Sequence, residues 1–222
     1  MAPYVELISV TKTFPAGLTR RNIYTRLFRS PPIAANRALF QNLNLKFEAG
    51  ETIGLVGPNG SGKTTLLKLI AGLTFADQGS IRIDGEDYEA FDRRRLGLIL
   101  GNDMIYTGLT GYENLEYSAY LYRCDDPADA IHRAIERWGL KDYVDSPVGN
   151  YSSGMRSRLA MARGTLHHPS LLLLDEPTVF LDADGLDRLR RYLSEGQKTV
   201  IVTTHQPDAI VTDRLVKMSE LH

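Results

Sequence analysis

The chain has 222 residues, a length that fits one domain better than two independent ones. Its composition is 43% hydrophobic and 24% charged with a formal net charge of −1, which excludes a disordered or collagen-like chain. No uninterrupted apolar run exceeds four residues, far short of the roughly 20 that cross a bilayer. The N-terminus also lacks a signal-peptide pattern. We therefore expect a protein that neither spans a membrane nor is secreted by that route.

Cysteine usage and charge distribution narrow the range of partners. A single cysteine, Cys124, excludes an intrachain disulfide and a multi-cysteine metal site, and it suits a reducing cytosol. The first 50 residues carry seven basic and two acidic side chains, whereas the remainder is acidic overall. A nearly neutral chain argues against nucleic acid as a partner, but the basic arm allows a local anionic one such as a phospholipid surface.

Short β-branched or leucine-rich runs alternate with longer helical stretches, which predicts an α/β fold with a mainly parallel sheet. Three runs, Thr52–Val56, Leu171–Leu174 and Thr199–Thr204, are apolar enough to be strands covered by helices on both faces. Each leads into glycine-rich or polar residues. Because ligands bind beyond the carboxyl ends of such strands, we expect these three segments to converge on one site.

Between about residues 102 and 165 the sequence takes on helical periodicity. Helices are predicted to start at Gly111 and to cover Asp129–Trp138 and Ser153–Arg163. We interpret 102–165 as a helical subdomain inserted into a core formed by about 1–101 and 166–222, all within a single domain over 1–222.

The strongest motif is a phosphate-binding loop directly after the strand Thr52–Val56. Its eight residues are Gly57, Pro58, Asn59, Gly60, Ser61, Gly62, Lys63 and Thr64, and Thr65 follows in the predicted helix as a further nucleotide-binding residue. Glycines let the backbone wrap closely around phosphate oxygens, and the helix N-terminus adds partial positive charge. We expect Lys63 to neutralise the β- and γ-phosphates and the Thr64 hydroxyl to coordinate Mg²⁺. The alternative is a plain glycine-rich turn with a surface lysine.

Two carboxylates and a histidine follow the other two strands. Asp175 and Glu176 are adjacent, so their side chains point to opposite faces and cannot play the same part. We predict that Asp175 holds Mg²⁺, directly or through water, and that Glu176 polarises the attacking water. His205 ends the strand Thr199–Thr204 and is a candidate for contacting the γ-phosphate or that water. The alternatives are a strand-end turn and a structural histidine.

A further motif, Tyr-Ser-Ser-Gly-Met at residues 151–155, lies 20 residues before Asp175. With it, the chain resembles the nucleotide-binding subunit of an ABC transporter of the ABC-2 exporter type. The resemblance covers nearly the whole chain, since Asp182 falls at the D-loop position and His205 at the H-loop position. It implies the fold of a RecA-like P-loop NTPase, with a mainly parallel sheet, an inserted helical subdomain and a small antiparallel β portion.

The resemblance also implies an active site shared between two subunits. Ser152, Ser153 and Gly154 would open a helix that binds the γ-phosphate of ATP on a second subunit's P-loop. Two copies, or one copy and a paralogue, would sandwich two ATP molecules, with Asp182 signalling across the interface. The alternative is an ordinary Ser-capped helix. Phe14 sits where the family places the aromatic ring that stacks on adenine, with a core aromatic as the alternative.

Two departures from the family pattern stand out. The first is Gly101, which occupies the position of a glutamine that contacts Mg²⁺ and relays its state to the membrane subunit. We therefore expect weakened or rerouted coupling to the membrane subunit, with Asn102 or Asp103 as substitutes for the glutamine.

The second departure is a long basic insertion at 15–38, which resembles those of polysaccharide and teichoic-acid exporters. The apolar residues of this insertion have helical spacing. We expect the insertion to lie near anionic lipid or the membrane subunit. The side chains expected to make these contacts are Arg20, Arg21, Arg26 and Arg29, together with Leu27 and Phe28. A solvated cationic loop is the alternative.

The resemblance implies an ATPase that docks on a separate integral-membrane subunit, at the cytoplasmic face of the membrane, and drives export. Lys63 and Mg²⁺ would stabilise charge, Glu176 would act as general base and His205 would position the reactants. The alternatives are a soluble ABC-type ATPase not coupled to transport and a module that clamps ATP without appreciable turnover. The sequence does not identify the exported substrate.

Overall fold

A computed structural model describes residues 4–15, 36–101, 104–179, 181–196 and 198–221 of the chain. The basic insertion, including Arg20, Arg21, Arg26 and Arg29 with the apolar pair Leu27 and Phe28, lies outside the described residues, as do Asn102 and Asp103.

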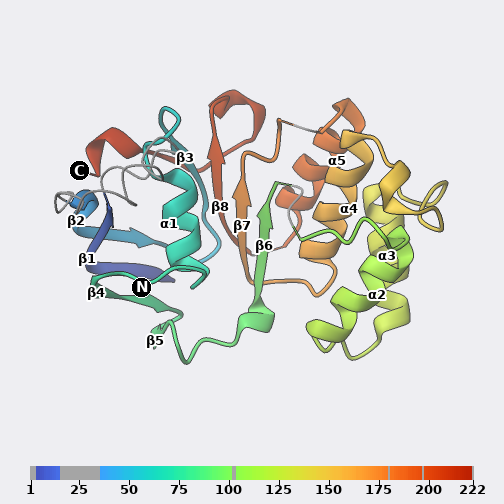
Figure 1. Cartoon of the computed structure of the whole chain (residues 1–222), viewed down its shortest axis with the longest axis horizontal. Helices are drawn as coiled ribbons and strands as arrows, with labels where there is room; N and C mark the ends of the chain where they lie inside the picture. The colour runs from blue at the N-terminus through green and yellow to red at the C-terminus, as the bar shows by residue number, and fades with distance from the viewer. Residues whose placement is uncertain (1–3, 16–35, 102–103, 180, 197, 222) are drawn as a thin grey trace, which may run out of the picture.

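In the part of the chain that the structure describes, the larger sheet has five parallel strands in the order β6-β7-β8-β3-β9. Their bounds are Leu96–Leu100 for β6, Leu171–Asp175 for β7, Thr199–Thr204 for β8, Thr52–Val56 for β3 and Arg214–Lys217 for β9. The arrowheads of β6, β7 and β8 point the same way in Figure 1. The three strands expected from the sequence are therefore neighbours in one parallel sheet, and the predicted fold class is confirmed.

A second, smaller sheet is antiparallel and has the order β2-β1-β4-β5. Its strands are β1 (Val5–Pro15), β2 (Asn36–Phe47), β4 (Gln78–Ile83) and β5 (Glu86–Asp87). The pairing of β1 with β2 is interrupted by register shifts, and Ser9 and Asn42 have positive φ angles of 50° and 52° there. Such irregularities bend the strands away from a regular ladder.

The described residues form five α-helices, and side-chain caps begin four of these. They are α1 (Lys63–Ile70), α2 (Gly111–Leu121), α3 (Pro127–Trp138), α4 (Ser153–Thr165) and α5 (Ala183–Ser194). Thr110, Asp126, Ser152 and Asp182 accept backbone N–H bonds at the starts of α2 to α5, as residues at that position do. Single-turn 3-10 helices cover Arg93–Arg95, Val148–Asn150, Pro207–Ala209 and Met218–Glu220. The predicted helices are confirmed, with ends that differ by one or two residues.

Two apolar cores lie on opposite faces of the parallel sheet. Leu171 and Leu173 of β7 pack with α1 and the antiparallel sheet, whereas Leu172 and Leu174 pack with α2 to α5. Figure 1 shows α1 and the small sheet on one side of β6–β8 and the other four helices on the other side. Because alternate side chains of a strand point to opposite faces, an unbroken run of leucine is what two covered faces require.

Candidate active site

The carboxyl ends of β3, β7 and β8 bring three distant segments together. Val56 pairs with Thr204, and Asp175 pairs with Thr203, so these strands end level with one another. His205, immediately after β8, places Nε2 2.8 Å from Oδ1 of Asn59 in the loop after β3. The convergence expected from the strand ends is therefore observed.

The loop 57–62 between β3 and α1 is a tight turn that depends on glycine. Gly60 and Gly62 have φ angles of 77° and 98°, in the left-handed region that favours glycine. A Cβ atom at Gly62 would also come within 2.9 Å of the Phe40 ring. Position 62 therefore favours glycine for two reasons, the left-handed backbone angle and the lack of space for a side chain.

Lys63, the first residue of α1, is almost buried, with 6% of its surface exposed. Its Nζ donates to the carbonyl oxygen of Gly57 at 2.7 Å, which holds the ammonium group inside the loop. The hydroxyl of Ser61 is buried in the same loop and has no hydrogen-bond partner among the described residues. An unpaired buried hydroxyl is costly, so the loop is built to receive another polar group.

Asp175, the last residue of β7, is fixed by two hydroxyl groups. Thr64 Oγ1 donates to its Oδ2 at 2.8 Å, and Thr203 Oγ1 donates to its Oδ1 at 2.7 Å. Hydroxyl and carboxylate oxygens are the hard ligands that Mg²⁺ prefers. The donor set of Thr64 and Asp175 therefore fits the metal expected from the sequence.

Glu176 has an unusual backbone conformation for a residue with a side chain. Its φ angle is 48°, and its N–H donates to Thr203 Oγ1 at 2.9 Å. Left-handed φ values are uncommon outside glycine, and they persist where the surroundings over-determine them. Its Oε1 lies 3.0 Å from Nε2 of His205 and 3.5 Å from Nζ of Lys63, within ion-pair distance though not in hydrogen-bond geometry. The carboxylate thus faces the loop and the histidine at once.

The Ser-Ser-Gly segment at 152–154 lies at the start of α4. Ser152 accepts a hydrogen bond from the Met155 N–H at 3.2 Å and is exposed. Asp182 caps α5 and also pairs with Arg158 of α4 at 2.7 Å. No contact joins Ser152 to the phosphate-binding loop within the described residues, and α4 and α1 lie on opposite faces of the sheet (Figure 1).

Two remaining sequence predictions fall at the edges of the site. Phe14 lies in β1 opposite Arg37 of β2, and it is 43% exposed rather than part of the core. Gly101 directly follows β6 and has a φ angle of 60°, and a Cβ added there would meet nothing within 4 Å.

The sequence reasoning missed several residues around the loop. A cavity of about 470 Å³ lies between β2 and the loop, and Arg37, Gln41 and Ser219 help to line it. Thr203, which holds both Asp175 and the Glu176 backbone, was not predicted either. The one signal in the sequence was its position, since Thr203 carries a hydroxyl group near the end of the strand that leads to His205.

Comparison with known proteins agrees with this geometry. Residues 40–179 match the ABC transporter family. The chain is 36% identical over 174 residues to the ABC transporter ATP-binding protein NatA of Bacillus subtilis (strain 168), covering 74% of this chain and 71% of NatA. It is 37% identical over 180 residues to the cytochrome c biogenesis ATP-binding export protein CcmA of Vibrio vulnificus (strain YJ016), covering 78% and 88%.

The fold is also similar to a solved structure, the dimeric structure of a post-hydrolysis state of an ATP-binding cassette bound to ADP and Pi. The TM-score is 0.79 at 25% sequence identity, over 96% of this chain and 93% of that one. Fold and site together define an ATP-binding cassette of the P-loop NTPase class. The chain belongs to the ABC transporter family, as one of its ATP-binding and ATP-hydrolysing subunits. Within the described part of the chain, no helix has the length and apolarity to cross a bilayer.

Proposed function

We propose that this chain hydrolyses ATP at the carboxyl ends of β3, β7 and β8 and thereby drives export of a substrate through a separate integral-membrane subunit. One observation carries the proposal. Lys63, Glu176 and His205, from three segments far apart in sequence, lie within 3.5 Å of one another. A cation, a carboxylate and an imidazole at one point provide charge stabilisation, a base and a hydrogen-bonding group.

In this proposal the phosphate-binding loop grips the triphosphate. Lys63 exchanges its bonds to loop carbonyls for the β- and γ-phosphate oxygens. The phosphates are surrounded by the rest of the loop and the start of α1, namely Gly57, Pro58, Asn59, Gly60, Ser61, Gly62 and Thr65. Thr64 and Asp175 are the residues that would hold Mg²⁺, which would supply positive charge to stabilise the phosphates during transfer.

Glu176 is the proposed general base. Its left-handed backbone is anchored on Thr203, and this turns the carboxylate toward Lys63 and His205. A carboxylate in that position accepts a proton from water as the water attacks the γ-phosphate in line. His205 contacts both Glu176 and Asn59, so it can orient the water or the γ-phosphate.

We further propose a composite site formed by two copies of the chain. Ser152, Ser153 and Gly154 would bind the γ-phosphate on the partner's loop, and Asp182 would relay its state. Two findings support this: α4 lies on the opposite face of the sheet from α1, and a similar cassette was solved as a dimer. Phe14 is exposed and so is available to stack on adenine.

The proposal places the chain on the cytoplasmic face of a membrane. Residues 102–165 would act as the helical subdomain within a single domain over 1–222, and the basic segment 20–29 would approach anionic lipid or the membrane subunit. Export is supported by the similarity to relatives such as CcmA, an ATP-binding export protein. Gly101 has no side chain for a metal contact, so coupling to the membrane subunit would use another route.

The decisive experiment compares Glu176→Gln with the wild-type chain. We expect ATPase activity to fall by roughly 10² to 10⁴, as for loss of a general base, while ATP binding is kept. Unhydrolysed ATP should then hold the variant as a dimer in analytical ultracentrifugation. Glu89→Gln, which neutralises an exposed glutamate far from the loop, is the matched control.

Hydrolysis by Glu176→Gln at the wild-type rate would remove Glu176 as the base. A variant that binds ATP but stays monomeric, also beside its membrane subunit, would overturn the composite site. His205→Ala should lower the rate of ATP hydrolysis without abolishing ATP binding. This variant therefore separates the positioning of the reactants from the binding of the phosphates.

A further inference from the structure

Phe14 lies near the end of β1, where the small sheet loses one of its strands. On one side of β1 the pairing with β4 stops at Thr11, opposite Gln78, the first residue of β4. Within the described residues, the part of β1 from Lys12 to Phe14 therefore has a strand neighbour only on the other side, in β2. That pairing is irregular, with register shifts on both sides of Lys12. The ladder alone thus determines the position of Phe14 only weakly.

Asp77, the residue directly before β4, bonds to this end of β1 through its side chain. Its Oδ2 accepts the Thr13 N–H at 2.6 Å and the Thr13 hydroxyl at 2.8 Å, and its Oδ1 accepts from Nζ of Lys12 at 2.9 Å. Its own N–H donates to the carbonyl oxygen of Thr11 at 2.8 Å. Asp77 is therefore bonded to three consecutive residues of β1, and Phe14 is the next residue along the chain.

The hydrogen bonds to the Asp77 side chain are of the strong, charge-assisted kind. The bond from Lys12, and then the two from Thr13, lower the pKa of Asp77 from 3.8 to about 2, so the carboxylate is ionised at neutral pH. The Lys12 side chain is only 13% exposed, so water competes little for its ammonium group. Asp77 therefore fastens Lys12 and Thr13 where the ladder with β4 has ended.

Lys12 extends this link to the Phe14 ring. Its Nζ lies over the ring, 5.5 Å from the centroid, within the range of a cation–π contact. The ammonium group thus covers one face of the ring, although Phe14 as a whole is exposed. A flat ligand would therefore stack on the opposite face.

The Phe14 ring also stands near the cavity that leads to the phosphate-binding loop. Phe14 pairs with Arg37 of β2, and residues directly opposite each other place their side chains on the same face of a sheet. Arg37 lines the cavity of about 470 Å³ whose other wall includes loop residues 58–61. This volume is within the range for small-molecule sites. A nucleotide with its phosphates in the loop can therefore place its sugar in the cavity and its base on Phe14.

We propose that Asp77 is a positioning residue for the base of ATP, because it holds Lys12 and Thr13 so that one face of the Phe14 ring is presented to the base. The proposal rests on the function proposed above, in which Phe14 stacks on adenine. Asp77 does not touch the nucleotide in this scheme. It acts on the affinity for ATP through Phe14 and has no effect on how the loop binds the phosphates.

Steady-state kinetics separate the base contact from the phosphate contacts. KM and kcat are measured for ATP, and inorganic tripolyphosphate, which has no base, is tested as a competitive inhibitor. Phe14→Ala should raise KM for ATP by about five- to 100-fold, the range for loss of a base–aromatic stack. Asp77→Ala should raise KM by about three- to tenfold, because the ring remains but is no longer fixed. In both variants kcat and the inhibition constant of tripolyphosphate should stay close to the wild-type values.

Two further variants calibrate the effect of Asp77→Ala. Asp77→Asn loses the charge but keeps the shape and one acceptor oxygen, so its KM should fall between those of Asp77→Ala and the wild type. Asp87→Ala is the matched control. Asp87 also bonds a basic side chain of the small sheet, Arg82 at 3.2 Å, but this partner lies on β4 rather than β1. Asp87→Ala should leave KM for ATP unchanged.

A double mutant shows whether Asp77 acts through the ring. In a chain that already carries Phe14→Ala, the addition of Asp77→Ala should raise KM no further. An equal rise in both backgrounds overturns the proposal, because Asp77 then acts independently of Phe14. So does a tripolyphosphate inhibition constant that rises together with KM, or a KM for Asp77→Ala that equals that of Asp87→Ala.

Phe14→Ala alone separates the role of Asp77 from the role of the ring. If Phe14→Ala raises KM and neither Asp77 variant does, Asp77 has no positioning role, while the stacking of Phe14 on adenine stands. If Phe14→Ala itself leaves KM unchanged, the base does not stack on this ring, and the positioning role of Asp77 is excluded with it.

Discussion

Thr64 donates its hydroxyl proton to Oδ2 of Asp175 at 2.8 Å, although the two residues are 111 positions apart in the sequence. Thr64 is the second residue of α1, and Asp175 is the last residue of β7. The two proposed oxygen ligands of Mg²⁺ are thus already in contact. Thr203 holds the second oxygen of Asp175, so the carboxylate has little freedom to rotate. A pair of ligands fixed in this way loses less entropy when a metal binds.

The role of Thr203 gives the first prediction. Thr203→Val removes the hydroxyl that orients Asp175 and keeps the side-chain shape. We expect the Mg²⁺ concentration for half-maximal ATPase activity to rise by roughly 10 to 100-fold, as when an outer-shell partner of a metal ligand is lost. The measurement is a Mg²⁺ titration of ATPase activity at saturating ATP.

Thr199→Val is the control for this variant. Thr199 is buried at the opposite end of the same strand, where its hydroxyl accepts the N–H of Gly50. Its replacement costs a buried hydrogen bond far from Asp175. If both variants require the same Mg²⁺ concentration, Thr203 has no role in positioning Asp175.

The second prediction concerns the link between α4 and α5. Arg158 of α4 is 16% exposed and pairs with both Asp182 and Asp184 at the start of α5. Arg158→Ala leaves Asp182 without an ion-pair partner among the described residues, while Asp184 keeps Arg188, and we expect the free energy of unfolding to fall by about 1–3 kcal/mol. Arg190→Ala breaks an exposed ion pair with Asp187 and an exposed hydrogen bond to the backbone oxygen of Ala209, and it should cost about 1 kcal/mol or less. Urea denaturation measures both values, and equal losses would show that the α4–α5 link adds no stability.

The predictable part of this fold comes from patterns that are local in sequence. The four leucines of β7 indicate a strand with two covered faces, and the glycine spacing at 57–62 indicates a loop around phosphate. Capping residues such as Ser152 mark where helices begin. These signals also placed Asp175 and His205 at one edge of the sheet, because parallel strands end on the same side.

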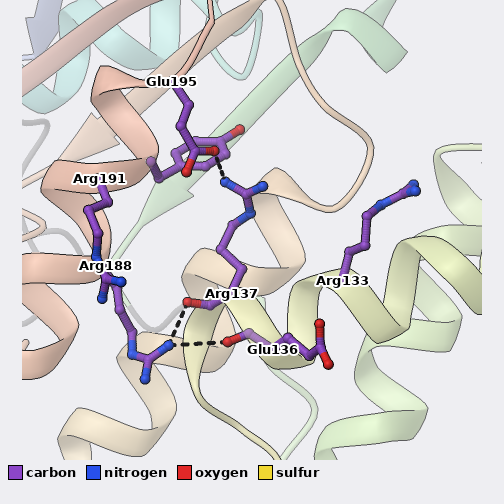
Figure 2. Close-up of a pocket in the computed structure, with 7 residues that line it drawn as sticks. Arg133, Glu136, Arg137, Arg188, Arg191 and Glu195 are labelled. Atoms are coloured by element: carbon purple, nitrogen blue, oxygen red, sulfur yellow. Dashed lines mark hydrogen bonds and ion pairs between the residues drawn. The ribbon is translucent and has the colours of Figure 1, made fainter.

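What the sequence does not reveal depends on contacts between distant segments. The positive φ angle of Glu176 results from the anchoring of its N–H on Thr203, 27 positions away. The irregular pairing of β1 with β2, which sets where Phe14 lies, involves bends at Ser9 that no residue type signals. The packing of α3 against α5 likewise joins helices that are separated by a long stretch of chain, and Figure 2 shows Arg188 of α5 bonding to two backbone carbonyls at the end of α3.

The third prediction follows from the ring of His167, which is mostly but not fully buried. It stacks on Tyr122 with ring centroids 3.6 Å apart, and its Nε2 lies 3.1 Å from the carbonyl oxygen of Leu96. Its Nδ1 is buried and has no hydrogen-bond partner among the described residues, so a second ring proton would be unsatisfied. Burial is the main cause that lowers the pKa of His167 from 6.5 to about 4.

The direction of the pH effect follows from which state binds the proton more readily. The unfolded chain takes up a proton near pH 6.5, and the folded chain does so only near pH 4. His167 therefore costs no stability above pH 6.5, and the folded state loses stability as the pH falls from 6.5 to about 4. The full loss is about 3 kcal/mol.

His167→Phe keeps an aromatic ring against Tyr122 and cannot titrate, so its free energy of unfolding should fall less over this range. Urea denaturation at pH 7.5, 6 and 5 tests this against His132→Phe, which replaces an exposed histidine. If the two variants lose stability equally as the pH falls, the buried ring is not the group that titrates.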